Sequence, residues 1–301
     1  MESTVYVILD SKERIIGALV PPPIEGDARS PEARWEAAME RLGWKFEDLR
    51  VRGEERGAFA SAAPAARGDF TAVSFGVSYG GGQVVSGVPL AAPPRSDHGH
   101  TQVPGELSQA LASFFPKPYD HMKRNMDALY DRHRHLRRNF NNSEYPTAAA
   151  NLGPRTVCHQ HNDCSNYPGL ACAITALGDF DFRRGGHMCL WDLKLKIQFP
   201  PGCTILLSSA GMRHGNAPIA PGERRYSFTQ YCPGGLLRWV RYGFRRAKTL
   251  SKAKRAQLDR REGEGWAGQL ARLSKYAELQ ADRRWLLEQD VARAESVLQR
   301  T

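Results

Sequence analysis

The sequence predicts an α+β protein with a β-sandwich or jelly-roll core, flanking helices and a charged helical C-terminal extension. Two observations lead to this fold class. Between residues 153 and 231, short apolar segments are separated by glycine and proline turns, a spacing typical of a sandwich or jelly roll. Outside that region apolar residues recur at helical spacing, and beyond Phe244 the chain is charged and helical to its end.

The N-terminal half alternates between short strands and amphipathic helices. The Pro21-Pro22-Pro23 run separates the first strand from the first helix, because proline interrupts regular structure. The helix that ends near residue 140 is strongly basic. The expected elements are a buried strand at 5–9, a helix at 31–42, a strand from residue 70 to the glycines at 80–82, and helices at 106–115 and 119–140.

The central region predicts five strands. Residues 189–199 alternate clearly between apolar and polar side chains, so we expect one continuous strand with Trp191, Leu193 and Leu195 on a single face. Pro200-Pro201-Gly202 ends that strand in a turn. The expected strands are 157–161, 170–177, 189–199, 203–209 and 225–231.

The charge of the chain favours a polyanionic partner. The 301 residues include 42 Lys or Arg and 32 Asp or Glu, which give a formal net charge of +10. Such a balance is typical of proteins that bind nucleic acid. A protein with a solvated basic tail would have the same charge, so composition alone leaves both interpretations open.

Cysteine usage and hydropathy indicate an intracellular protein. None of the six cysteines forms a C-x-x-C pair, so neither a zinc knuckle nor a thioredoxin-like motif is expected, and we predict reduced core thiols. The first residues lack a basic segment followed by an apolar stretch, so we expect no signal peptide. No apolar run approaches the ~18 residues that cross a bilayer, so we expect no membrane partner.

One metal-binding constellation stands out. Of nine histidines, only His161 has an aspartate two residues later, Asp163. At a strand end, residues i and i+2 point to the same side, so both side chains can reach one ion. His214 follows the strand expected at 203–209 and supplies a distal ligand. Two imidazoles and one carboxylate form the site of non-haem Fe(II) oxygenases, which keeps positions open for cosubstrate and oxygen.

Two other histidines compete for the same role. His159 lies on the same strand face as His161, which makes it a supporting group or a surface residue. His187 follows a glycine turn, where a histidine that caps a strand is an equally good interpretation. The ordered set of H-x-D, two strands, distal histidine and a following arginine favours His161, Asp163 and His214.

The strand expected at 225–231 offers a site for a carboxylate. Arg225 and Ser227 share one face of it, and a buried arginine is costly unless it meets an anion. A guanidinium beside a hydroxyl suits the carboxylate of 2-oxoglutarate. The structural alternative pairs Arg225 with Glu223 or Asp192. Arg224 is the alternative anchor if the strand faces the other way.

Together these residues resemble the fungal branch of the TET/JBP dioxygenases, many of which travel with transposons. The resemblance covers residues 153–244 and follows the order of the family's motifs. The motifs that carry it are GPRTV at 153–157, HNDCSN at 161–166, AITALGDFD at 173–181, GGH at 185–187, LWDLKL at 190–195 and RYSFTQY at 225–231.

The resemblance implies a double-stranded β-helix, which is a cupin-like jelly roll, in residues 55–243. Residues 1–54 then form an N-terminal strand and helix region, and 244–301 a basic helical extension. The family places Fe(II) on His161, Asp163 and His214, and 2-oxoglutarate on Arg225 with Ser227.

The resemblance also implies two further roles and a reaction. Arg155 helps hold cosubstrate or base, with a structural salt bridge as the alternative. Asn166 contacts the flipped base, with an Asx turn as the alternative. The family uses O2 and couples decarboxylation of 2-oxoglutarate to succinate with oxidation of a methyl group. The substrate is 5-methylcytosine in most members and N6-methyladenine in some fungal ones, in duplex DNA and after base flipping.

Two departures from the family pattern affect these implications. The family usually carries a base-contacting histidine late on the arginine strand or just after it. This chain has Gln230-Tyr231-Cys232-Pro233 there, so cytosine specificity does not follow. Residues 84–102 also form an insert before Pro104-Gly105. The insert begins with valine and ends with glutamine, as a translated, unspliced intron would. Sequencing of the transcript tests this hypothesis, and a message that encodes the stretch would refute it.

Two basic segments are candidate phosphate contacts for DNA in the nucleus. One is the run from Arg241 to Arg261, which also fits a nuclear import signal, and the other is the helix at 119–138. A solvated helix face is the alternative for each. Two other functions stay open: a 2-oxoglutarate dioxygenase that acts on RNA or protein, and a catalytically silent, transposon-derived DNA-binding protein.

Overall fold

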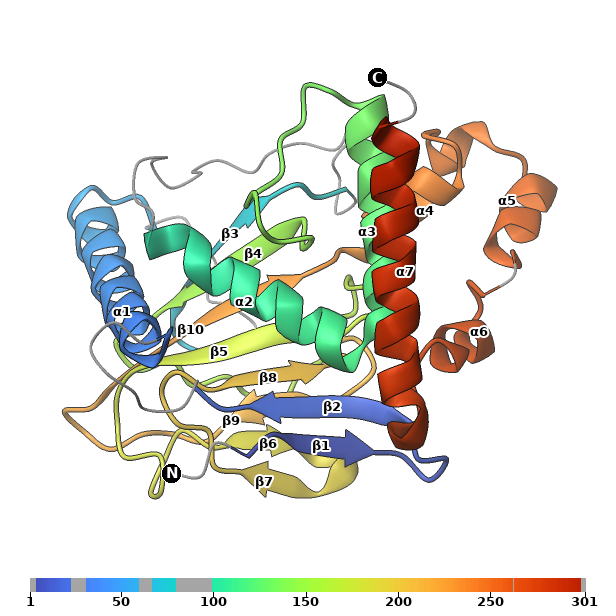
Figure 1. Cartoon of the computed structure of the whole chain (residues 1–301). Helices are drawn as coiled ribbons and strands as arrows, with labels where there is room; N and C mark the ends of the chain where they lie inside the picture. Colours follow the sequence, from blue (N-terminus) through green and yellow to red (C-terminus); the bar gives the residue numbers. More distant parts are fainter. Residues whose placement is uncertain (1–3, 23–30, 60–66, 80–98, 262, 299–301) are drawn as a thin grey trace.

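The computed structural model describes residues 4–22, 31–59, 67–79, 99–261 and 263–298. Two antiparallel sheets form its centre (Figure 1). The seven-stranded sheet has the order β1 (Tyr6–Leu9), β2 (Ile15–Val20), β8 (Thr204–Leu207), β5 (Cys172–Asp179), β10 (Arg224–Tyr231), β4 (Thr147–Leu152) and β3 (Thr71–Gly76). The three-stranded sheet has the order β7 (Leu195–Ile197), β6 (Met188–Leu190) and β9 (His214–Asn216).

Each central strand buries two different faces. In β8, Ile205 and Leu207 pack with Met188 and Leu190 of β6 between the two sheets, whereas Leu206 packs with the helices on the other side. The alternation follows from the two-residue period of a strand. Because the helices cover only one face of the large sheet, the other face is free to form a site with the small sheet.

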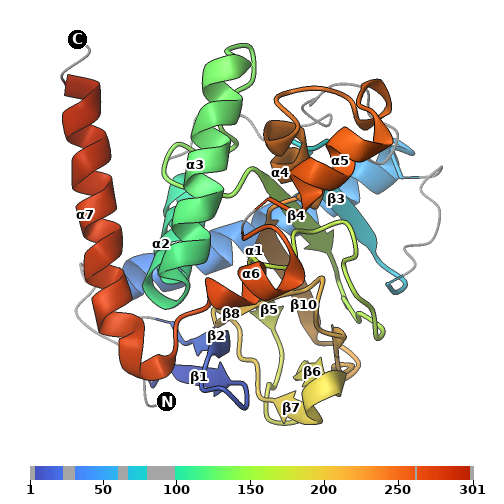
Figure 2. The same cartoon turned by 90° about the vertical axis from the view of Figure 1, so that its right-hand side faces the viewer.

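The helices cover the face of the large sheet that points away from the small sheet, and one edge of the large sheet. In Figure 1, α1 and α2 cross the large sheet, and α3 stands beside α7. Figure 2 shows α7 at one side of the molecule and α5 at the other. The helices are α1 (Pro31–Glu55), α2 (Gly99–Phe114), α3 (Pro116–Arg132), α4 (Gly234–Arg241), α5 (Lys252–Asp259), α6 (Trp266–Ala271) and α7 (Leu279–Leu298), with 3-10 turns at Trp191–Leu193, Ala247–Thr249 and Tyr276–Glu278.

The expectation of one strand over residues 189–199 is wrong. The segment is a hairpin of β6 and β7, in which Met188 pairs with Ile197 and Leu190 with Leu195. A 3-10 turn and the left-handed Lys194, with φ of 54°, reverse the chain between them. Trp191 and Leu195 are therefore exposed at 37% and 42%. An alternating pattern is satisfied equally by one long strand and by two short ones.

Two more strand expectations need correction, and some strands were not predicted. Residues 157–161 form no ladder, and His161 makes only an isolated bridge to His214. The strand near residues 5–9 lies at the sheet edge and is partly exposed instead of buried. Strand β4 was not predicted, because its Thr-Ala-Ala-Ala-Asn-Leu sequence has low strand propensity, yet all six residues are buried between β10 and β3.

Some expectations fall on residues outside those described. Residues 84–98 of the proposed insert are among them, whereas 99–102 form the first turn of α2. The domain boundaries at 54 and 243 stay predictions. In the structure β1 and β2 continue the large sheet, and α7 is tied to α3 by ion pairs of 2.8 Å between Lys117 and Asp282 and between Lys123 and Asp290.

Glu264, between α5 and α6, connects the C-terminal extension to the core. Its buried carboxylate accepts hydrogen bonds from Arg241 Nη1 at 2.7 Å, the Tyr167 hydroxyl at 3.1 Å and Arg272 Nη2 at 3.4 Å. Tyr167 directly follows Asn166 in the chain. The extension is therefore anchored beside the loop on which the sequence places a metal ligand.

We expect Glu264→Gln to lower the free energy of unfolding by about 2 to 3 kcal/mol, because it leaves two largely buried guanidinium groups without this carboxylate. The value lies below the ~3 to 5 kcal/mol typical of a broken buried ion pair, because Arg241 keeps Asp259. Urea denaturation measures it. The matched control is Glu278→Gln, whose pair with Lys275 is 3.7 Å long and half exposed, with an expected change below about 0.5 kcal/mol. Equal changes in the two variants would contradict this role of Glu264.

Candidate active site

His161, Asp163 and His214 come together on the face of the large sheet that is free of helices. His161 and Asp163 lie in the segment between β4 and β5, and His214 is the first residue of β9. The backbones of His161 and His214 exchange two hydrogen bonds, of 3.1 and 3.0 Å, and Asp163 N donates to Ser209 O at 2.9 Å. These bonds fix the H-x-D segment against the distal histidine.

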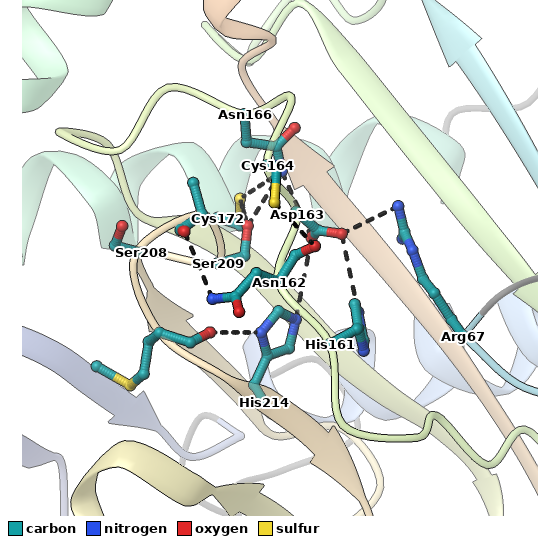
Figure 3. Close-up of polar contacts among 12 residues, drawn as sticks. Arg67, His161, Asn162, Asp163, Cys164, Asn166, Cys172, Ser208, Ser209 and His214 are labelled. Atoms are coloured by element: carbon teal, nitrogen blue, oxygen red, sulfur yellow. Dashed lines mark hydrogen bonds and ion pairs between the residues drawn. The ribbon is translucent and has the colours of Figure 1, made fainter.

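The three side chains converge on one point (Figure 3). Asp163 Oδ1 lies 3.8 Å from His161 Nε2, and Asp163 Oδ2 lies 3.9 Å from His214 Nε2. One ligand atom from each residue lies within 4.8 Å of the others, and no other group of three such side chains among the described residues does so. The spacing allows one ion to contact all three.

Hydrogen bonds prepare both imidazoles for a metal. His161 Nδ1 lies 2.8 Å from His159 O, and His214 Nδ1 lies 2.9 Å from Met212 O. A carbonyl only accepts, so Nδ1 carries a proton in each ring, and the Nε2 of the neutral ring is the atom with a free lone pair. Burial also lowers the pKa of His214, which favours the neutral ring. Two neutral imidazoles and one carboxylate fit Fe(II).

Two neighbours hold the Asp163 carboxylate. Arg67, from the segment before β3, places Nη2 2.9 Å from Asp163 Oδ1 and is half exposed (Figure 3). Asn166 donates through Nδ2 to Ser209 Oγ at 3.0 Å and lies 3.5 Å from Asp163 Oδ2. Arg67 was not predicted from the sequence, because no local pattern marks it and the fold alone brings it to the site.

A cavity of about 190 Å³ opens beside the three ligands. Its walls come from β3, β4, β5, β6, β9, β10 and the loop after Asp163. Polar and charged side chains line much of it. They are Arg67, Ser74, Ser78, Asn151, His161, Asp163, Ser165, Asn166, His214, Asn216, Arg225, Ser227, Thr229 and Tyr231.

Arg225 is a buried cation without a carboxylate partner. It is 1% exposed, its Nη1 donates to Thr156 O at 3.3 Å, and its Nε has no partner in the described structure. Burial lowers its pKa to about 10. Since the desolvation of an unpaired cation is costly, this arrangement fits an anion in the cavity.

In the structure, Arg225 and not Arg224 faces the cavity, and Arg225 does not pair with Glu223 or Asp192. Glu223 accepts hydrogen bonds from Asp181 N and Ala220 N, and Asp192 pairs with Arg213, so neither pairs with Arg225. Arg224 is exposed and does not line the cavity.

Two polar side chains complete this wall of the cavity. Ser227 Oγ accepts a hydrogen bond from Asn151 Nδ2 at 2.8 Å. The hydroxyl proton of Ser227 therefore remains available for a carboxylate next to Arg225. Asn151 was not predicted. It is a buried asparagine in an alanine-rich strand, which is a weak local signal of function.

Arg155 does not contribute to the cavity. Its side chain is exposed, and its Nη2 donates to Ile219 O at 3.0 Å. The expectation that it holds cosubstrate or base therefore finds no support. The side chains of the two competing histidines are not part of the ligand cluster: His159 is exposed, and His187 is buried but does not line the cavity. Asn166, by contrast, is buried and lines the cavity.

Comparisons with known proteins address the fold. No family model and no curated protein matches the sequence. Among solved structures, NgTET1 in complex with 5mC DNA is similar with a TM-score of 0.52 and 16% identity over 77% of each chain. OsALKBH1 has a TM-score of 0.36 and 15% identity over 71% of this chain and 97% of its own. That similarity is too low to support an argument.

The likeness to NgTET1 confirms the predicted fold class: a double-stranded β-helix core with flanking helices. Within this fold, the His161, Asp163 and His214 cluster and the unpaired Arg225 share one cavity. The donor set fits the Fe(II) and 2-oxoglutarate chemistry expected from the sequence. In the described part of the chain, no helix is both long and apolar enough to cross a membrane.

Proposed function

We propose that the protein is an Fe(II)- and 2-oxoglutarate-dependent dioxygenase that oxidises the methyl group of a methylated base in DNA. One observation carries the proposal: a two-histidine, one-carboxylate cluster lines the same cavity as a buried arginine that has no counter-ion among the described residues. A silent DNA-binding protein would have no use for a buried unpaired cation, which costs stability.

Each side chain has a defined task in this proposal. His161, Asp163 and His214 hold Fe(II), and Arg225 with Ser227 binds the carboxylate of 2-oxoglutarate distant from the metal. Iron and cosubstrate, when bound, supply the oxidising power through O2 and the decarboxylation of 2-oxoglutarate to succinate. Asn166 keeps the Asp163 carboxylate in position, since its amide lies 3.5 Å from Oδ2.

Two features support a base in DNA as the substrate. The chain has a net charge of +10, and its similar structure NgTET1 was solved with 5mC DNA. Chemistry on a base requires that the base leave the stack and enter a pocket with aromatic and hydrogen-bonding side chains. Tyr231, in the region where the family pattern has a histidine, lines the cavity, and Asn166 lines the same cavity. We assign both to the base.

Mass spectrometry of nucleosides tests this function. Duplex DNA with both 5-methylcytosine and N6-methyladenine is incubated with protein, Fe(II), ascorbate and 2-oxoglutarate. We expect oxidised cytosine or loss of the adenine methyl group, together with succinate. The base that changes identifies the substrate. If folded, iron-loaded protein leaves both bases unchanged, the DNA-base proposal fails. RNA and protein are then the substrates to test.

A further inference from the structure

We propose that the end of α3 and the segment from α4 to the 3-10 turn after it form a binding surface for the phosphates of duplex DNA. We call this the α3–α4 surface and define it by Arg134, Arg137, Arg238, Arg245, Arg246 and Lys248. The identity of its partner rests on the proposed function, because the target base of the duplex would enter the adjacent cavity.

The six cations are exposed, and in the described part of the chain none of them makes an ion pair with a carboxylate. Other basic residues of the same region are neutralised. Arg241 pairs with Asp259 at 2.8 Å and Glu264 at 2.7 Å, although it lies within the same basic run. Exposed cations without local counter-ions are those that gain most from phosphate groups.

The structure divides the basic helix at 119–138 into two parts. Lys123 pairs with Asp290 of α7 at 2.8 Å, and Arg124 pairs with Asp120 at 2.8 Å. The Lys123 pair joins α3 to α7, whereas the Arg124 pair lies within α3. After the helix end, Arg138 pairs with Asp127 and Glu144. In the described part of the chain, Arg134 and Arg137 make no ion pair.

An aromatic cluster brings the two parts of the surface together. The ring of His133 lies 6.0 Å from that of Trp239 and 5.4 Å from that of Phe244, measured between centroids. Trp239 Nε1 donates to His133 Nε2 at 3.1 Å. Arg134 directly follows His133, Arg238 precedes Trp239, and Arg245 follows Phe244. The cluster therefore brings these three exposed arginines, which are far apart in the sequence, close together in the fold.

This surface begins at the wall of the cavity. Helix α4 starts directly after Pro233, which lines the cavity, and Gly234 N donates to Ser165 O, also of the lining, at 2.8 Å. Eight helical residues span about 12 Å at 1.5 Å per residue. That length corresponds to about three or four phosphates of one strand at about 3.4 Å each. A duplex with one base in the cavity would therefore lay its flanking phosphates on α4.

The test compares two triple variants with the same net charge. The first is Arg245→Gln/Arg246→Gln/Lys248→Gln on the α3–α4 surface. The control is Lys12→Gln/Arg41→Gln/Arg284→Gln, at exposed positions in the β1–β2 turn, α1 and α7. Fluorescence anisotropy measures the affinity for an unmethylated duplex at several salt concentrations. Thermal unfolding checks that both variants fold.

We expect the slope of log K against log salt to become shallower by about 0.9 for each phosphate that the protein no longer neutralises, thus by about 2 to 3 in the first variant. The control should keep the wild-type slope. Equal slopes in the two variants, or binding of anionic vesicles in preference to the duplex, would overturn the proposal. If the first variant oxidises the base and its DNA affinity keeps the wild-type salt dependence, the proposed role of the surface fails and the proposed function stands. If the surface binds DNA but the wild-type protein oxidises no base, the proposed function fails and the role of the surface stands.

Discussion

Arg225→Met is expected to weaken 2-oxoglutarate binding strongly and to raise the stability of the ligand-free protein. The loss of one partner of a buried charge pair costs about 2 to 5 kcal/mol, so affinity should fall at least about 30-fold. In the ligand-free protein, the same substitution is expected to be stabilising. Arg225 is 1% exposed and has no carboxylate, so an apolar side chain of similar length removes a desolvation cost.

Two measurements check this pair of effects. Calorimetry with Mn(II) in place of Fe(II) follows 2-oxoglutarate binding without turnover, and urea denaturation follows stability. Arg224→Met is the matched control, because the neighbouring side chain is exposed on the opposite face of β10. It should change neither quantity appreciably. A variant at Arg225 that still binds 2-oxoglutarate would show that another cation anchors the cosubstrate.

His214→Ala is expected to remove the metal and with it all iron-dependent succinate formation. The outer partners of a metal site typically contribute about 10- to 100-fold to affinity or activity, and a direct ligand should exceed the upper value. Duplex DNA binding should persist, because the α3–α4 surface does not include His214. Metal analysis after desalting gives a readout that does not depend on turnover.

The control for His214 is another buried histidine. His187 is 8% exposed, whereas His214 is 4% exposed, so removal of either ring leaves a void of similar size. His187 lies outside the ligand cluster. His187→Ala should therefore retain metal while it lowers stability. Unchanged succinate formation in His214→Ala would remove that residue from the proposed mechanism and open the choice of ligands again.

The sequence predicted the elements of this protein that depend on local order. His161 and Asp163 stand two residues apart, and Arg225 and Ser227 do the same, so strand geometry puts each pair on one side. The fold class followed from the short strands between residues 153 and 231, and the comparison with NgTET1 confirms it.

Local patterns also have limits within a single element. Alternation predicted one strand at 189–199, but a left-handed turn at Lys194 makes it a hairpin. The reverse error occurred for β4, whose alanines have little strand propensity. Their small side chains nevertheless suit a central strand that is buried on both faces. In both cases packing against neighbouring strands overrides the local preference.

Only the tertiary structure decided which charges have partners. Arg67 reaches Asp163 from a distant segment, and Asn151 reaches Ser227 across two paired strands. The same holds for Arg225, whose lack of a carboxylate is apparent only once the whole cavity is assembled. A residue's type and its period along the chain are encoded locally, and so the sequence determined which residues are candidate ligands and their order. Ion pairing depends on which segments the sheets bring together, and so the fold alone decided which cations remain free to bind an anion.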